Sequence, residues 1–258
     1  MILLTGKNSS SPSIYTTRFL KWFNEERPSL FYSFIQYVQT NAEEFDPFCK
    51  LSTLIALNIL KKMLGQRTLA HAVRDSGPRI YYHNAPVHWG KVFDYVPHFR
   101  VGRDAPQQSS HVKTLAIENK AAAQAVLCFL NSSLFYWFNW QHSNCRDLSL
   151  KDIVRAPLDV RAMVANSETE FPALAARLIR DYRKHKKLYS RVVDGITTEF
   201  DSFYPAESKP IIDEIDRVLA KHYGFTEEEL DFIINYDIKY RMGMSAEQAG
   251  PGGDAEEE

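Results

Sequence analysis

The segment from Arg100 to His111 carries the kinds of side chain that contact DNA bases. It gathers cationic, amide, hydroxyl and imidazole groups among small residues: Arg100, Arg103, Gln107, Gln108, Ser110 and His111. Arginine can bind guanine through two hydrogen bonds in the major groove, and glutamine can bind adenine in the same way. The composition therefore predicts an exposed base-reading loop, although an ordinary solvated loop has a similar composition.

Residues 79–91 could extend this chemistry, because aromatic rings alternate there with hydrogen-bond donors. We expect His83, Asn84 and Lys91 to be exposed to DNA. Tyr81 and Trp89 are better explained as core residues, because aromatic side chains of strands are most often buried.

Lys113, which follows the loop, and Arg146 are two further candidate contacts. For Arg146 an ion pair with Asp147 or Asp152 is an equally good interpretation.

A helix is expected from Pro172 to Arg191. Five of its cationic residues follow one another at spacings of 3, 4, 3 and 4: Arg177, Arg180, Lys184, Lys187 and Arg191. On a helix this spacing gives one narrow stripe, which could bind the phosphate backbone. A solvated helix face is the alternative interpretation.

The charge is divided unevenly along the chain. Residues 1–195 contain 26 Lys and Arg against 16 Asp and Glu, whereas residues 196–258 contain 5 against 16. A basic part is expected where a protein meets phosphates. The acidic part could equally dock on the basic part of the same chain.

Metal-dependent cleavage is an alternative chemistry. Glu118-Asn119-Lys120, with Asp104 upstream, has the form of a nuclease site in which carboxylates hold magnesium and lysine polarises the scissile phosphate. His142 and Cys145, with Cys128, would supply only part of a zinc site. We therefore expect no bound metal, and a nuclease remains the alternative function.

Periodicity and turn signals predict an α+β fold. Helices are expected from Ile14 to before Pro28, over Cys49–Leu64, Ala121–Trp140 and Leu150–Val154, and after Ser208 and Thr226; short strands are expected at Ile80–Tyr82, Lys91–Tyr95 and Lys113–Ile117. The capping signals are Ser149 or Asp147, Gly224, and the pair Thr226 and Glu229.

The chain of 258 residues is 45% hydrophobic, so it can bury one large core or two small ones. Three widely spaced cysteines favour a reducing compartment. The N-terminus lacks the apolar core of a signal peptide, and polar residues interrupt the only long apolar run, so we expect a cytoplasmic protein that does not associate with a membrane.

Three blocks of this sequence resemble one protein family. They are residues 80–99 (IYYHNAPVHWGKVFDYVPHF) with the step from Ser110 into Ile117, residues 127–153 (LCFLNSSLFYWFNWQHSNCRDLSLKDI), and residues 203–243. They are similar to the C-terminal target-recognition region, the Taq-like specificity domain, of adenine-N6 DNA methyltransferases from restriction-modification systems. Residues 14–34 resemble, more faintly, the end of the catalytic domain of that family.

Composition predicts that residues 1–13 and the acidic tail, residues 244–258, are disordered. Between them, the resemblance implies a helical lead-in over residues 14–77, the target-recognition domain over 78–165, and a helical C-terminal region over 166–243. It also implies that double-stranded DNA and a catalytic methyltransferase domain or subunit are the partners.

The catalytic motifs of the family are missing. The sequence has no Gly-rich turn after an expected strand that could bind S-adenosylmethionine, because its one Gly-x-Gly, Gly250-Pro251-Gly252, lies in the polar C-terminal tail. Asn84-Ala85-Pro86-Val87 lacks the second proline and the aromatic ring of the family's catalytic tetrapeptide. We therefore expect no cofactor in this chain, S-adenosylmethionine in the catalytic partner domain, and no catalysis by this chain alone. A structural bridging subunit of a defence complex is a further alternative.

Overall fold

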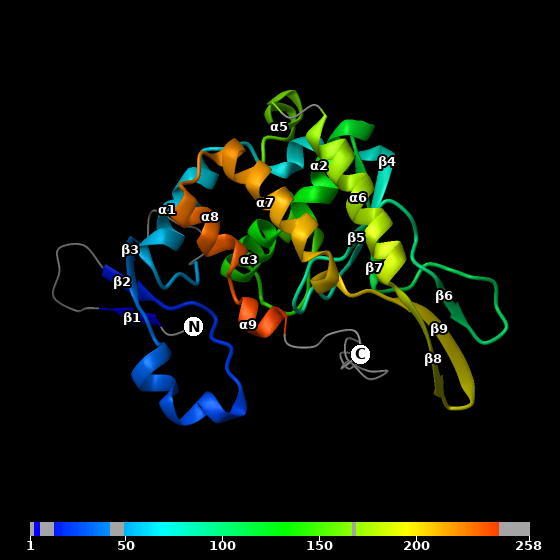
Figure 1. The fold of residues 1–258 in the computed structure, drawn as a ribbon, viewed down its shortest axis with the longest axis horizontal. Helices are drawn as coiled ribbons and strands as arrows, with labels where there is room; N and C mark the ends of the chain where they lie inside the picture. The colour runs from blue at the N-terminus through cyan, green and yellow to red at the C-terminus, as the bar shows by residue number, and fades with distance from the viewer. Residues whose placement is uncertain (1–2, 6–12, 42–48, 167–168, 243–258) are drawn as a thin grey trace.

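The computed structural model describes residues 3–5, 13–41, 49–166 and 169–242. These residues form an α+β fold with nine α-helices and three small antiparallel sheets, which confirms the expected fold class. The sheets lie at the edges of the molecule, around a helical centre (Figure 1).

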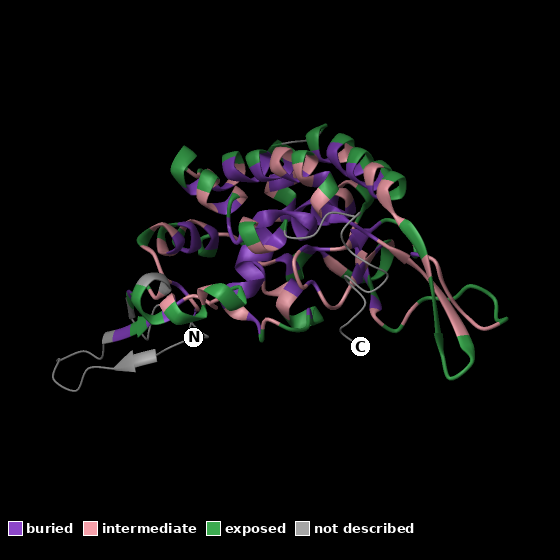
Figure 2. Ribbon diagram, turned by 60° about the horizontal axis from the view of Figure 1, so that its bottom comes forward, coloured by how far each residue is buried: buried purple, intermediate pink, exposed green. Residues whose placement is uncertain are grey.

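Two consecutive helices, α2 (Lys120–Asn131) and α3 (Ser133–His142), form the centre of the core. Nearly every residue of α3 is buried, as expected for a helix that is apolar on all sides. Figure 2 shows these buried segments at the centre, enclosed by helices that are exposed on their outer faces. The enclosing helices include α1 (Leu54–Leu64), α6 (Glu170–His185), α7 (Lys209–Tyr223) and α8 (Glu227–Ile234).

The single helix predicted over Ala121–Trp140 is wrong, because the chain bends by 68° at Ser132. Ser132 has an extended backbone, and its hydroxyl donates to the Phe129 carbonyl at 2.6 Å and accepts from the Phe135 amide at 3.0 Å. One serine side chain therefore stabilises the end of α2 and the start of α3. Among the described residues no single helix is long and apolar enough to cross a membrane, although α2 and α3 taken together would pass by length and composition.

Asp216 of α7 completes the start of α3. Its carboxylate accepts from the amides of Ser133 and Leu134 at 3.3 and 3.1 Å. Because Asp216 is 2% exposed, burial raises its pKa to about 6.

The first sheet near the site contains β5 (Val92–Phe93), β4 (Val73–His83) and β7 (Val112–Ile117), in this order. β4 begins upstream of the predicted Ile80–Tyr82 strand and crosses the predicted domain boundary at residue 78. The predicted Lys91–Tyr95 strand is reduced to two residues. A register shift lies between Arg74 and Arg79, where Gly77 has a φ of +136°.

The second sheet contains β6 (Phe99–Val101), β9 (Ile196–Ser202) and β8 (Lys187–Val193). The helix predicted to continue to Arg191 is therefore wrong beyond His185. Asp194 and Gly195 both have positive φ, 51° and 77°, which is the backbone of a tight two-residue hairpin turn. The hairpin β8–β9 projects from the body with β6 beside it, at the lower right of Figure 1.

The N-terminal part is less helical than predicted. β1 (Leu3–Thr5), β2 (Ser13–Thr16) and β3 (Val38–Asn41) form a sheet. Between β2 and β3 the chain forms a 3₁₀ helix, η1 (Asn24–Ser29), and a π-helix, η2 (Leu30–Phe34). The helix predicted from Ile14 is therefore wrong, and Pro28 lies inside η1. Leu3–Thr5 lies in a strand, although residues 1–13 are predicted to be disordered. The predicted acidic tail, residues 244–258, lies outside the described residues.

Local capping signals are confirmed downstream. Ser149 caps α4 (Leu150–Val154) in a capping box with Asp152, and Thr226 caps α8 in a capping box with Glu229. α7 ends at Gly224, which has a φ of +67°. The remaining elements are η3 (Leu69–Ala72), α5 (Val160–Asn166), η4 (Pro205–Ser208) and α9 (Ile238–Arg241).

Candidate functional site

A cleft of about 410 Å³ lies between the β5–β4–β7 sheet and the β6–β9–β8 sheet. One wall comes from the ends of β4, β5 and β7, and it carries His83, Lys91, Phe93 and His111. The other wall is one face of the second sheet. We call this space the cleft.

Strand register explains which side chains form the second wall. Residues directly opposite one another in an antiparallel pair point to the same face of the sheet. Phe99 lies opposite Phe200, and Arg191 lies opposite Thr198. All four line the cleft, so alternate residues of three strands share this face.

The structure brings three predicted contacts together in the cleft: His83, Lys91 and His111. The rings of His83 and His111 are stacked, with centroids 5.8 Å apart and planes 14° apart. Nδ1 of His83 accepts from the Ala85 amide at 3.2 Å, so the neutral ring carries its proton on Nε2, a hydrogen-bond donor. The backbone amide of Asn84 donates to the His111 carbonyl at 2.9 Å, which joins the two segments of this wall.

A buried asparagine holds β5, and with it Phe93, in place. Asn131 of α2 accepts from the Val92 amide at 3.1 Å and donates to the Val92 carbonyl at 2.9 Å, as a neighbouring strand would. Its side-chain oxygen also accepts from the Tyr182 hydroxyl at 3.1 Å. Burial raises the pKa of Tyr182, so this hydroxyl stays protonated and remains a donor.

Aromatic packing beneath β5 forms the floor of the cleft. The rings of Phe93 and Phe203 are 4.4 Å apart between centroids, and Tyr182 packs against both. Phe93 and Phe203 both line the cleft and are almost fully buried. The floor is therefore continuous with the main core, which makes it a rigid support for the two walls.

Gly90 allows the chain before β5 to approach α2 closely. A Cβ atom at this position would lie 2.2 Å from the Leu130 carbonyl oxygen, which is shorter than any ordinary contact. Only glycine fits there without a shift of the backbone.

Several predicted DNA-contacting residues instead bind other groups of the protein. Arg100 lies on the sheet face opposite the cleft, where it pairs with Glu199 at 2.8 Å and lowers the pKa of that carboxyl group. The side-chain amide nitrogen of Gln108 donates to the Val112 carbonyl at 2.7 Å, and the ammonium group of Lys113 donates to the Ser110 carbonyl at 2.6 Å.

Arg103 and Gln107 remain available for contacts from the loop. Both residues are exposed, and neither side chain has an ion pair or hydrogen bond with another residue that the structure describes. The backbone amide of Gln107 donates to the Phe99 carbonyl at 2.9 Å, which fixes the loop against β6.

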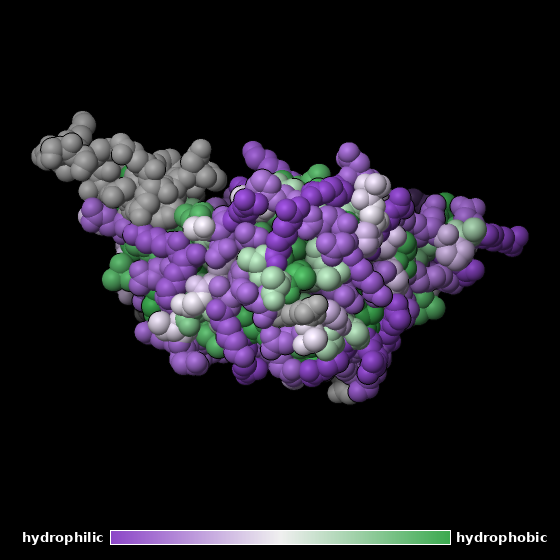
Figure 3. Space-filling model, turned by 90° about the horizontal axis from the view of Figure 1, so that it is seen from above, coloured by the Kyte–Doolittle hydropathy of each residue, from purple (hydrophilic) through white to green (hydrophobic). Residues whose placement is uncertain are grey.

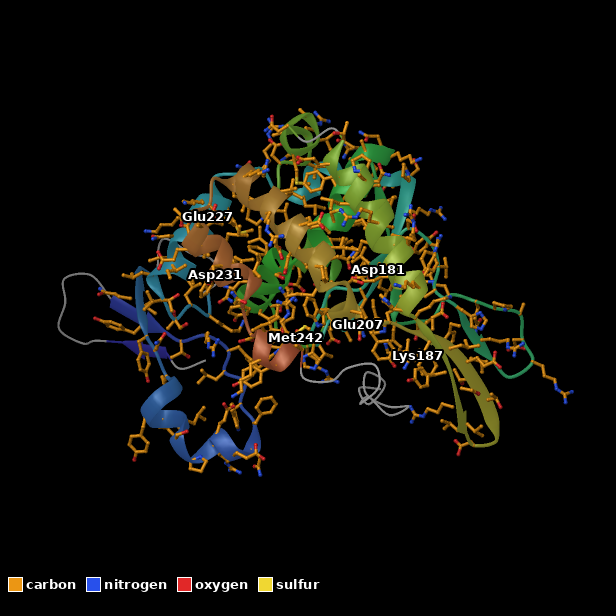
Figure 4. All side chains as sticks on the ribbon, in the orientation of Figure 1. Asp181, Lys187, Glu207, Glu227, Asp231 and Met242 are labelled. Carbon is orange, nitrogen blue, oxygen red and sulfur yellow. The ribbon has the colours of Figure 1, made fainter. Side chains whose placement is uncertain are left out.

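The predicted cationic stripe is divided between two elements. Arg177, Arg180 and Lys184 lie on α6, whereas Lys187 and Arg191 lie on β8. Figure 4 places Lys187 at the base of the hairpin, just beyond the helix segment that carries Asp181. Arg191 lines the cleft because it lies on β8 and not on a continuation of α6.

The members of the stripe also differ in their partners. Arg177 binds Glu214 through both terminal nitrogens, at 2.6 and 2.8 Å. Arg180 and Lys184 are exposed and form no ion pair with any described residue. The face seen in Figure 3 is mostly hydrophilic, and its apolar side chains occur in small separate groups.

Arg146 is exposed, and its expected partner Asp152 pairs with Arg155 at 3.0 Å instead. The ion pair of Arg146 with Asp152 is therefore not formed. The backbone amides of Arg146 and Asp147 both donate to the side chain of Asn144, so this segment is a tight turn.

The acidic C-terminal segment docks on the basic part of the chain. Among the described residues, five Lys or Arg side chains of the basic part pair with carboxylates of the acidic part: Arg18 with Asp237, Lys62 with Glu229, Arg100 with Glu199, Arg177 with Glu214, and Lys186 with Asp201. Part of the charge asymmetry is thus used within the fold. Exposed cations near the cleft and on α6 that form no such pair with a described residue include Arg103, Lys113, Arg180, Lys184 and Arg191.

The residues of the alternative nuclease site do not meet. Glu118 lies at the far end of β7 from the loop that carries Asp104, roughly 20 Å away for a strand of this length. The Glu118 carboxylate is paired with Arg74 at 2.9 Å and with Arg161 at 3.2 Å. It is therefore already neutralised by two guanidinium groups.

No group of three potential metal ligands occurs within the described part of the chain. His142 contacts Cys49 at 3.1 Å, while Cys128 donates to the Phe171 carbonyl from within the core. Burial raises the pKa of Cys49 to about 12 and lowers the pKa of His142 to about 4. Both groups are thus neutral, which does not suit a nucleophile and its base.

Sequence reasoning missed the hairpin and three residues of its cleft face, Val193, Thr198 and Phe200, and it placed Arg191 on a helix instead of on β8. The available signal was the Asp194-Gly195 pair between two runs rich in β-branched residues.

Comparison with protein-family models, with curated proteins and with solved structures finds no match for this chain.

Proposed function

We propose that this chain is a DNA target-recognition module that acts with a catalytic methyltransferase domain outside it. The observation that carries the proposal is the cleft, in which His83, Lys91 and His111, from segments far apart in the sequence, lie opposite Arg191 of the hairpin. Donors, cations and aromatic rings on two facing walls are the groups that nucleic-acid recognition requires.

The shape of the second sheet supports duplex DNA as the ligand. A two-stranded β-ribbon fits the major groove of B-DNA. The hairpin β8–β9 has seven residues in each strand, and β6 pairs with three residues of β9, so the rest of the hairpin is two-stranded. Arg103 and Gln107 lie on the loop that follows β6, beside this ribbon. They would contact base edges, whereas Arg180 and Lys184 on α6 would contact phosphates.

Catalysis would belong to the partner domain, which would bind S-adenosylmethionine and extrude the adenine. This module would fix the register of the duplex from the other side. A protein with this role must be in the compartment that holds the DNA, which for a restriction-modification protein is the cytoplasm.

Duplex binding as a function of salt tests the proposal. We expect the purified chain to bind a mixed-sequence duplex, with an affinity that falls steeply as salt rises. The variant Lys91→Ala/Arg103→Ala/Arg191→Ala should bind more weakly and should lower the salt slope by about 0.9 for each phosphate contact that is lost.

The matched control replaces Arg67, Arg217 and Lys221, three exposed cations that do not line the cleft, by alanine. This variant also loses positive charge, but it should keep the wild-type affinity. Equal losses in the two variants would mean that binding depends only on net charge and that the cleft is not the interface.

A bridging subunit is the second candidate, and exposed aromatic residues near the N-terminus favour it. Phe31 is 74% exposed and Tyr32 is 93% exposed, as residues of a protein-binding surface are. A chain that bridges proteins should bind no duplex at any salt concentration. The same titration therefore distinguishes the two functions.

A further inference from the structure

The cleft has more aromatic surface than contact with a paired duplex requires. Phe99 and Phe200 lie side by side on the wall of the second sheet. The stacked pair of His83 and His111 lies on the other wall, and Phe93 belongs to the floor. The bases of an intact duplex present only their edges in the grooves, so rings on both walls suit a base that has left the stack.

The size and the polar rim of the cleft fit a single nucleotide. A volume of about 410 Å³ lies at the small end of the range for small-molecule sites. Ser109, Thr198 and Ser202 also line the cleft and can form hydrogen bonds with a base edge. A purely apolar ligand would leave the hydroxyls of Thr198 and Ser202 without a hydrogen-bond partner among the described residues, whereas the Ser109 hydroxyl already accepts from the His111 amide.

Cations on both walls favour a nucleotide within a strand over a free base. Lys91 lies on the wall of the first sheet, and Arg191 lies on the hairpin opposite. A nucleotide within a strand has one phosphate on each side of its sugar, and each phosphate can be neutralised by one of these residues.

We infer that the cleft binds one unstacked nucleotide of the DNA, with its base between the aromatic walls and its phosphates near Lys91 and Arg191. This inference rests on the proposed function, because it names the part of the DNA that the same cleft binds. Stacking on aromatic side chains accepts any base, so the site adds affinity for a distorted duplex and adds little sequence preference.

Three duplexes that share one sequence test the inference. The first is fully paired and about 24 base pairs long, a little over two helical turns. The second carries one extra unpaired thymidine at its centre, and the third carries an abasic nucleotide at that position. We expect the unpaired thymidine to be bound about tenfold more tightly than the abasic nucleotide, as one stacked base predicts.

Two substitutions locate the effect in the cleft. Phe200→Leu keeps an apolar side chain and removes the ring, whereas Thr198→Trp keeps a residue suited to a strand and fills the space. Each should reduce the preference for thymidine over the abasic nucleotide to about twofold or less. Leu188→Ala, at an exposed position of the same hairpin, should keep the full preference.

The outcomes separate the two proposals. Equal affinity for the thymidine and abasic duplexes, with normal binding of the paired duplex, overturns the nucleotide site and leaves the proposed function intact. A preference that survives both Phe200→Leu and Thr198→Trp also overturns it. If no duplex is bound at low salt, the proposed function itself fails.

Discussion

Replacing Asn131 by alanine should destabilise the protein by about 4 kcal/mol, because the substitution leaves three buried polar groups without partners. These groups are the amide and the carbonyl of Val92 and the hydroxyl of Tyr182, which Asn131 binds at distances between 2.9 and 3.1 Å. Each unsatisfied buried group costs about 1–3 kcal/mol, and partial relaxation keeps the total below the sum of the maxima.

Urea denaturation followed by far-UV circular dichroism measures this loss. With a slope of about 2.5 kcal/mol per molar, the midpoint should fall by roughly 1.5 M. The control is Asn58→Ala on α1, where the asparagine is exposed and the change should stay within about 0.5 kcal/mol. A loss for Asn131→Ala that is no larger than that of the control would refute the reasoning.

A double-mutant cycle with Tyr182→Phe isolates one of the three bonds. Tyr182→Phe alone should cost about 1 kcal/mol, and in the Asn131→Ala background it should cost less, because the hydroxyl already lacks its partner. Additive losses would mean that the two side chains do not interact. The same cycle tests the support of the cleft, because Asn131 holds the strand that carries Phe93.

Three further predictions concern other positions. Gly90→Ala should lower the free energy of unfolding by about 2 kcal/mol or more in urea denaturation, because the new Cβ would lie 2.2 Å from a carbonyl oxygen; an unchanged midpoint would contradict the close approach. The pKa of Asp216 is about 6 in the folded state and 3.8 in the unfolded state, so the folded state binds the proton more tightly. The free energy of unfolding should therefore rise by about 1 kcal/mol from this group when the pH falls from 7 to 5. Asp216→Asn should remove that gain, which urea denaturation at pH 7 and pH 5 measures. The same change in unfolding free energy for wild type and variant would contradict the raised pKa of Asp216. Gly195→Val should open the hairpin turn, because a β-branched residue tolerates the φ of +77° poorly; limited proteolysis should then cut residues 187–202 faster than in wild type, while cleavage at an unchanged rate would argue against the turn.

Local capping signals in the sequence predicted several helix boundaries correctly. The capping box of Thr226 and Glu229 and the end of α7 at Gly224 are both confirmed. These features depend on residues three or four positions apart, whose contacts form whenever the helix forms. They could therefore be recognised without knowledge of the rest of the fold.

The hairpin shows where a local pattern misleads. The cationic residues at spacings of three and four continue from α6 into β8, so the periodicity suggested one helix through Arg191. The chain leaves the helix at Lys186, whose backbone is extended and whose side chain pairs with Asp201 of β9 at 2.8 Å. Beyond it, all seven residues of β8 pair with β9, so contacts with another strand give this segment its structure.

The candidate site is divided in the same way. Sequence reasoning selected His83, Lys91 and His111 by residue type, and these three line the cleft. It also selected Arg100 and Arg177, which are bound to Glu199 and Glu214. Residue type shows that a side chain can contact DNA, but only the fold shows whether another residue already uses it.

The sequence by itself determined the α+β composition, the caps and the set of side chains with suitable chemistry, because each of these depends on a residue and its near neighbours along the chain. The tertiary structure alone decided that two small sheets enclose a cleft, that Arg191 faces it, and that the acidic C-terminal segment is paired with cations of the basic part. The physical reason is that strand pairing and ion pairs join residues distant in sequence, and their free energies depend on which surfaces the folded core brings into contact.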